Sequence, residues 1–145
     1  MAHIQILNRE HIDGAAELEG LCFSEPWSPS ALELLLRDGN FGVAAVESGQ
    51  VLAYGGMTCC LDEGSVTNIA VHPLYRRRGL GRQVVLALLG EAEKRGIRTV
   101  FLEVRESNAA AKSLYLSEGF REIGHRKNFY RAPVEDALAM AYYFE

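Results

Sequence analysis

The order of the apolar patterns along the chain predicts an α+β domain with a mainly antiparallel sheet and one β-α-β unit in its middle. Three observations support this class. Short alternating runs typical of half-buried strands surround the helical segments, a turn at residues 47–50 separates two such runs, and an amphipathic helix separates two strands near the centre of the chain. The expected order is β-α-α-β-β-β-α-β-α-β-β, which corresponds to a mixed seven-stranded sheet flanked by four helices.

The elements of the first half follow from local patterns. Apolar residues recur at helical spacing between His11 and Cys22, and Ser28 before Pro29 is typical of a helix N-cap followed by proline at the first helical position. Glu47-Ser48-Gly49-Gln50 favours a hairpin turn. We expect strands at His3–Leu7, Phe41–Val46, Val51–Leu61 and Ser65–Val71, and helices at His11–Cys22 and from Pro29 to about Arg37.

The second half begins with the clearest helix of the chain. Its apolar stripe runs from Leu80 to Ala92, and Gly96 has the position of the glycine that ends a helix. The apolar run Thr99–Val104 suits a central strand. We expect a short helix opened by Ser107-Asn108 and ended by Gly119, followed by strands at Phe120–Tyr130 and Asp136–Phe144.

Composition limits the classes of function. The chain has 145 residues, 48% of them hydrophobic, which predicts one globular domain over residues 1–145. Its net charge of -4 disfavours non-specific nucleic-acid binding. No apolar run approaches the roughly 18 residues of a membrane span, and the N-terminus does not resemble a secretion signal, so we expect a cytoplasmic protein without membrane contact. Three cysteines without CxxC or Cys/His spacing predict neither a disulfide nor a metal site.

A cluster of arginines and glycines follows the strand that ends at Val71. Glycines allow a tight turn and a close approach of backbone to ligand, and the N-terminus of the next helix offers unpaired N–H groups. Together they predict an anion site suited to a pyrophosphate, although a solvated basic turn remains the alternative. Walker and dinucleotide fingerprints do not match, since the third glycine of the latter is replaced by Val84. The predicted anion-binding residues are Arg76, Arg77, Arg78, Gly79, Leu80, Gly81 and Arg82.

This R-x-x-G-x-G pattern between a strand and a helix resembles the GNAT acetyltransferase superfamily, and the resemblance extends over essentially the whole chain. Asn68–Pro73 before the motif, Leu102–Ala111 and Leu114–Phe120 after it are similar to the same family. Glu25–Ser28 and Asn128–Tyr130 are similar, more narrowly, to its RimI group, which acetylates the N-terminal alanine of a ribosomal small-subunit protein; Phe129 stands where a second tyrosine is common.

The resemblance implies a GNAT fold and acetyl-CoA as co-substrate. In such a fold the two parallel strands splay, and the acyl-CoA arm lies between them. The motif residues would then hold the pyrophosphate, backbone of Ile69, Ala70 and Val71 would face the pantetheine and the oxyanion, and Asn108 would bind the pantetheine arm. Asn108 is also a common type of helix cap, and the two roles are compatible.

Two residues are the candidates for proton transfer. Glu103 shares a strand face with Phe101 at the end of an apolar strand, where partial burial would raise its pKa toward that of a useful base. The alternative is a strand-end carboxylate paired with Arg105 or Arg121. Tyr115 lies seven positions after Asn108, two helical turns on, and is either a packed aromatic or the acid that protonates the leaving thiolate. The resemblance favours base and acid.

The resemblance implies a free α-amino group of a protein N-terminus as the acceptor, with N-terminal alanine of a ribosomal small-subunit protein as the expected case. Trp27 and Tyr130 are candidates to flank an acceptor channel, and each also suits the core. Two alternatives remain open. One is acetylation of lysine side chains or of a small amine, and the other is a non-catalytic module that only binds acyl-CoA.

Overall fold

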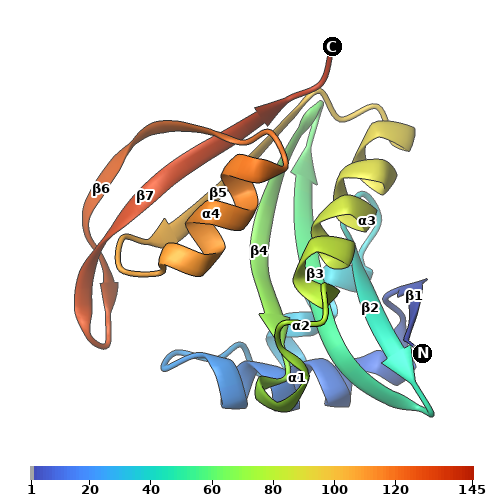
Figure 1. The fold of residues 1–145 in the computed structure, drawn as a ribbon. Helices are drawn as coiled ribbons and strands as arrows, with labels where there is room; N and C mark the ends of the chain where they lie inside the picture. The colour runs from blue at the N-terminus through green and yellow to red at the C-terminus, as the bar shows by residue number, and fades with distance from the viewer. Residues whose placement is uncertain (1) are drawn as a thin grey trace.

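The computed structural model describes residues 2–145 as one seven-stranded sheet with four α-helices, in the predicted order (Figure 1). The strands lie in the order β1-β2-β3-β4-β5-β7-β6, and only β4 and β5 are parallel. The strands are β1 His3–Ile6, β2 Phe41–Glu47, β3 Gln50–Cys60, β4 Glu63–Val71, β5 Thr99–Arg105, β6 Arg121–Arg131 and β7 Val134–Tyr143. The helices are α1 Ile12–Cys22, α2 Pro29–Leu32, α3 Leu80–Lys94 and α4 Ala109–Ser117.

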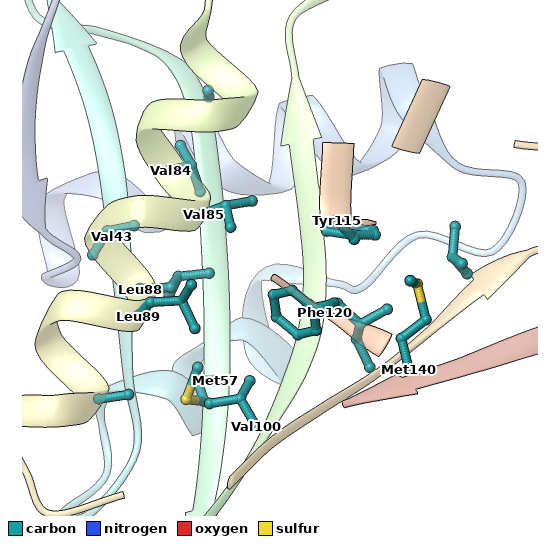
Figure 2. Packing of buried hydrophobic residues seen from close by; sticks show 14 of the residues in the cluster. Val43, Met57, Val84, Val85, Leu88, Leu89, Val100, Tyr115, Phe120 and Met140 are labelled. Atoms are coloured by element: carbon teal, nitrogen blue, oxygen red, sulfur yellow. The ribbon is translucent and has the colours of Figure 1, made fainter. Parts of the chain in front are cut away.

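The helices cover both faces of the sheet. A Cβ built on Gly55 would meet Val84 and Leu88 of α3, whereas one built on the next residue, Gly56, would meet Leu35 beyond α2. Successive strand residues point to opposite faces, so α3 and the α1–α2 region lie on opposite sides. Figure 2 shows the α3 side, where this core continues to Tyr115 of α4.

Capping geometry confirms the predicted helix ends at Ser28 and Gly96, whereas the last strand, β7, begins at Val134, two residues before the predicted Asp136. The Ser28 side chain accepts a hydrogen bond from the Ala31 N–H at 3.1 Å, and Gly96 has a φ of 81° just after α3. The predicted helix from Pro29 to about Arg37 is only partly right, since α2 ends at Leu32 and a 3-10 turn continues from Glu33 to Leu36. The prediction for β4 began two residues late, because Glu63 and Gly64 pair with the neighbouring strands although they resemble a turn.

The parallel pair β4 and β5 stays together for only three residues. Their ladder runs from the pair Glu63–Thr99 to the pair Ser65–Phe101 and then stops. Beyond it the strands diverge, as the splayed arrows of β4 and β5 in Figure 1 show. A bulge in β4 accompanies the divergence, because the pairing with β3 changes register between Gly55 and Met57. Backbone groups of the diverging ends therefore face each other without strand pairing.

Two further properties follow from the described residues. The three cysteines are free thiols, at Cys22, Cys59 and Cys60. No helix within residues 2–145 has the length and apolar character required to cross a bilayer.

Candidate active site

The arginine–glycine run forms a turn that leads directly into α3. Gly79 is the N-cap with a φ of 78°, a conformation that favours glycine, and open space surrounds the position of a Cβ there. The first hydrogen bond of the helix joins the Gln83 N–H to the Gly79 carbonyl at 3.0 Å. The preceding N–H groups of Leu80, Gly81 and Arg82 therefore have no partner within the helix, which is the arrangement an anion requires.

The second glycine has a different role from the first. A Cβ at Gly81 would lie 3.5 Å from Leu114 Cδ2 and 3.6 Å from Val71 Cγ2, so it would point toward α4 and β4. These are ordinary contact distances. Gly81 thus matters for the close packing of the helix start, whereas Gly79 provides the backbone conformation of the turn.

The arginines of the turn are exposed but not equivalent. Arg76 Nε donates to the Val71 carbonyl at 3.2 Å, which ties the turn to the end of β4. Arg82 forms an ion pair with Glu118 after α4. The guanidinium of Arg78 lies 5.1 Å from the centre of the Tyr75 ring, and Arg77 has a positive φ of 66°. Arg77 and Arg78 thus extend the positive surface beside the helix start, while Arg76 and Arg82 brace it.

The predicted cofactor strand lies at the diverging end of β4. Ile69, Ala70 and Val71 pair with β3 on one side, opposite Gly55, Tyr54 and Ala53. On the other side the ladder with β5 has already ended. Apart from the Val71 carbonyl, which accepts from Arg76 Nε and Cys22 Sγ, backbone of this segment is therefore available to a ligand between the strands.

Glu103 lies on the corresponding diverging end of β5. The burial of β5 alternates strictly along the strand, as predicted, and the Glu103 side chain is 29% exposed. Its ion-pair partner is Arg126 of β6, with Nε 3.8 Å from Oε2. The alternative pairing with Arg105 or Arg121 is wrong, because Arg105 binds Glu135 and Arg121 lies over the Tyr143 ring.

Tyr115 and Asn108 lie at opposite ends of α4. Asn108 is exposed and is the N-cap, since its side chain accepts a hydrogen bond from the Ala111 N–H at 3.1 Å. Tyr115 is only 8% exposed, and its ring lies 5.6 Å from that of Phe120 (Figure 2). Burial raises the pKa of Tyr115, and the neighbouring Tyr130 raises it further. The phenol therefore keeps its proton at every ordinary pH.

Tyr130 connects Glu103 with Tyr115. Burial raises the pKa of Tyr130 to about 12, and the charge of Glu103 contributes to the shift. Tyr130 in turn acts on Tyr115, and the guanidinium of Arg105, two residues after Glu103 on β5, lies 4.3 Å from the centre of the Tyr130 ring, so Tyr130 is the neighbour of both groups. The structure thus brings together two predicted proton-transfer residues and one predicted acceptor residue, although they come from β5, α4 and β6.

An arginine that the sequence analysis did not select holds Tyr130 in place. The guanidinium of Arg105 lies 4.3 Å from the centre of the Tyr130 ring and donates to the carbonyls of Ala132 and Pro133 and to Glu135. The hydrogen bonds that Glu135 accepts from Ser107 and the charge of Arg105 hold the pKa of its carboxyl below the usual range. Arg105 thereby fixes the turn between β6 and β7 above the diverging strands.

The loop between α1 and α2 reaches the same turn. Ser24 Oγ donates to the Ala132 carbonyl, and the Arg131 N–H donates to Glu25 Oε1 at 3.2 Å. Trp27 lies in this loop, is partly buried and packs against the core under α1. The loop and the turn thus meet although they are more than a hundred residues apart, and they carry the two predicted acceptor residues, Trp27 and Tyr130.

Glu19 of α1 is a second residue that is not among the predicted site residues, although the sequence contains a signal for it. Its side chain is completely buried and accepts hydrogen bonds from Tyr54, Asn68 and the Trp27 backbone N–H. In the sequence it is a lone charge on the stripe of Ile12 and Ala15, positions that are buried on one face of α1. Within residues 2–145, no three His, Cys, Asp or Glu side chains are grouped so that they could hold a metal ion.

Residues 12–120 match the model of the acetyltransferase (GNAT) family. The chain is 38% identical over 143 residues to the ribosomal protein bS18-alanine N-acetyltransferase of Escherichia coli (strain K12). The matched region covers 97% of each protein. It is 33% identical over 141 residues to a putative enzyme of the same name from Bacillus subtilis (strain 168), covering 96% of this chain and 93% of that protein.

The fold is also similar to a solved structure. The crystal structure of the ribosomal-protein-S18-alanine N-acetyltransferase from Escherichia coli superposes with a TM-score of 0.91 at 37% identity, over 99% of this chain and 94% of that one.

Proposed function

This chain belongs to the acetyltransferase (GNAT) family and is an acetyl-CoA-dependent N-acetyltransferase, and we propose that its acceptor is the N-terminal alanine of ribosomal protein bS18. Relatives that carry this name match almost the full length of the chain. The single observation that supports the chemistry is that Tyr130 of β6 neighbours both Glu103, on the diverging end of β5, and Tyr115 of α4.

Binding of the co-substrate would use mainly backbone. The free N–H groups at the start of α3 suit the pyrophosphate, and the exposed arginines Arg77 and Arg78 add positive charge. The unpaired edge of β4 at Ile69, Ala70 and Val71 suits the pantetheine arm, with Asn108 at the opposite side. An N–H of the same edge would stabilise the oxyanion that forms when the thioester carbonyl is attacked.

Glu103 would act as the base for the incoming amine. An α-amino group has a pKa of about 8, so a modest base, acting directly or through a water, is enough to remove its proton. The amine nitrogen then bonds to the thioester carbon, and collapse of the tetrahedral intermediate breaks the carbon–sulfur bond. Arg126, with Nε 3.8 Å from Oε2, is the cation nearest to the Glu103 carboxylate.

Tyr115 would act as the acid toward the departing thiolate. The free thiol of CoA is a weaker acid than an ordinary carboxyl, with a pKa near that of cysteine at about 8.5. A buried phenol with a raised pKa holds its proton at neutral pH and can donate a hydrogen bond to the thiolate as it departs. Because the pKa of the thiol is lower, complete proton transfer is uphill, and the donated hydrogen bond supplies the stabilisation.

The experiment is acetylation of a peptide that begins with the N-terminal residues of bS18, followed by mass spectrometry of the product. We expect one acetyl group on the α-nitrogen of alanine. Two control peptides separate the alternatives: one carries a blocked N-terminus and an internal lysine, and the other begins with a bulky residue. Modification of the blocked peptide would move the assignment to lysine side chains, and equal rates on the alanine peptide and the bulky one would remove N-terminal selectivity.

A further inference from the structure

Glu19 is a buried carboxylate that the proposed chemistry does not use. It lies on α1 with no exposed surface, yet it serves three donors from three different segments. Trp27 N–H donates to Oε1 at 2.8 Å, Asn68 Nδ2 lies 3.1 and 3.0 Å from the two oxygens, and the Tyr54 hydroxyl donates to Oε2. A buried carboxyl group without hydrogen-bond partners is destabilising, and these donors satisfy both of its oxygens.

One of these donors belongs to the bulge of β4. The register change places two residues of β4, Thr67 and Asn68, opposite the single residue Gly56 of β3. As a result Thr67 and Asn68 both face α1 and α2, where Thr67 lies near Leu35. The next residue, Ile69, faces α3 and begins the edge assigned to the co-substrate. The Asn68–Glu19 contact therefore lies immediately before that edge.

A second donor belongs to the acceptor side. The Trp27 N–H lies in the α1–α2 loop, and the same loop reaches the β6–β7 turn through Ser24 and Glu25. One carboxylate thus bonds both to the loop that borders the acceptor and to the strand that borders the thioester. Tyr54 of β3, which is fully buried, fixes the carboxylate from the third side.

We propose that Glu19 is a positioning residue that holds the acceptor loop in register with the diverging end of β4, so that the amine meets the thioester carbonyl. The proposal rests on the proposed function and deepens it by naming what aligns the two substrates. Glu19 touches neither substrate; it acts through the Trp27 backbone and through Asn68.

The test uses Glu19→Gln, with Glu17→Gln as the matched control. Glutamine offers one carbonyl oxygen to three donors, so the loop loses its anchor, whereas Glu17 is an exposed residue on the same helix. Trp27 is the only tryptophan, so its fluorescence reports the loop directly. In Glu19→Gln we expect red-shifted, more quenchable emission and a peptide KM raised by about tenfold, with the acetyl-CoA Kd within about twofold of the parent.

A rescue variant distinguishes positioning from mere stability. In the double variant Glu19→Gln/Asn68→Asp the carboxylate and the amide exchange places, so the new amide on α1 can donate to the new carboxylate on β4 and leave its oxygen to the Trp27 N–H. Recovery of the peptide KM and of the Trp27 emission supports the proposal. A lower Tm in Glu19→Gln with unchanged KM and emission overturns it, because Glu19 would then only stabilise the fold.

Two further outcomes stay interpretable. If Glu19→Gln fails to fold, Asn68→Ala replaces it in the test, because this variant removes the Asn68–Glu19 hydrogen bonds at a residue that is only partly buried. Unchanged Trp27 emission and unchanged kinetics of Asn68→Ala would overturn the proposal. Absence of any peptide acetylation by the parent protein refutes the proposed function by itself, while the Trp27 emission of the variants still decides whether Glu19 holds the loop.

Discussion

The two sides of the active site are built in opposite ways. Apart from Asn108, the co-substrate side is one continuous stretch from Ile69 to Arg82, and its useful groups are mainly backbone N–H and C=O groups at a strand edge and a helix start. The acceptor side joins the α1–α2 loop to the β6–β7 turn through contacts between residues 106 to 108 positions apart. The hydroxyl of Ser24 and the carboxylate of Glu25 make these contacts.

This difference determines which substitutions disrupt each side of the site. Backbone geometry tolerates many side-chain replacements but depends on single glycines, as at Gly79. A site fixed by Glu19, Arg105 and Glu135 depends instead on ion pairs and charge-assisted hydrogen bonds, each of which one substitution removes. We therefore expect mutations to separate co-substrate binding from acceptor binding.

The largest effect should come from the residues between the two sides. Glu103→Gln removes the base and Tyr115→Phe removes the acid, and each should lower kcat by roughly 10² to 10⁴. Stopped-time assays at saturating substrates measure the loss, and calorimetry should show that acetyl-CoA binding is kept in both. If the Glu103→Gln enzyme turns over at the parent rate, the base is a group other than Glu103.

The next effect should be confined to the co-substrate side. Gly79→Val forces a β-branched residue into a φ of 78°, so the turn must move and the acetyl-CoA Kd should rise by roughly ten- to a hundredfold. The control is Gly81→Ala, whose Cβ meets Leu114 and Val71 only at ordinary contact distances. Parent-like acetyl-CoA affinity in a folded Gly79→Val protein would show that the turn does not shape the anion site.

A smaller effect should appear on the acceptor side. Arg105→Lys keeps the charge but loses the planar group that stacks on Tyr130 and the forked bonds to the β6–β7 turn. We expect the peptide KM to rise by roughly five- to tenfold and the acetyl-CoA Kd to stay constant. A matching rise in both constants would mean that the two sides are not separable.

The smallest effect concerns the free energy of unfolding, and we expect it only at alkaline pH. Tyr54, Tyr115 and Tyr130 all have raised folded-state pKa values, mainly because of burial, and that of Tyr130 is about 12. Their contribution to the free energy of unfolding is complete below the unfolded-state value of about 10 and is lost as the pH rises through the folded-state values.

Urea unfolding at pH values from about 8 to about 11 measures this loss, and Tyr115→Phe should reduce its slope. A free energy of unfolding that does not change over this range would contradict the assigned burial of the phenols.

How far the sequence predicts this protein depends on whether a feature is local. The order of strands and helices and the turn before α3 follow from periodicity and glycine placement within a few residues. The partner of Glu103 does not, because β6 changes register twice, between Glu122 and Gly124 and between Arg126 and Tyr130. Each bulge shifts which residues face the side chains of β5, so simple alternation cannot select Arg126 over Arg121.

The carboxylates of the acceptor side were missed for a related reason. Glu19 is recognisable as a charge on an apolar stripe, but its partners Tyr54 and Asn68 lie on other strands, and only the fold shows that they converge. Asn68 faces Glu19 only because of the β4 bulge, which no pattern in β4 indicates. Long-range convergence of this kind is a property of the tertiary structure.

The short ladder between β4 and β5 has a consequence for how the molecule opens. Only three residue pairs join the strands, from Glu63–Thr99 to Ser65–Phe101, so residues on either side of this seam form two contiguous chain segments. The apolar core spans the seam, but cross-strand hydrogen bonds largely do not. Amide exchange should therefore report two cooperative units, and a ligand bound along the seam should slow exchange in both at once.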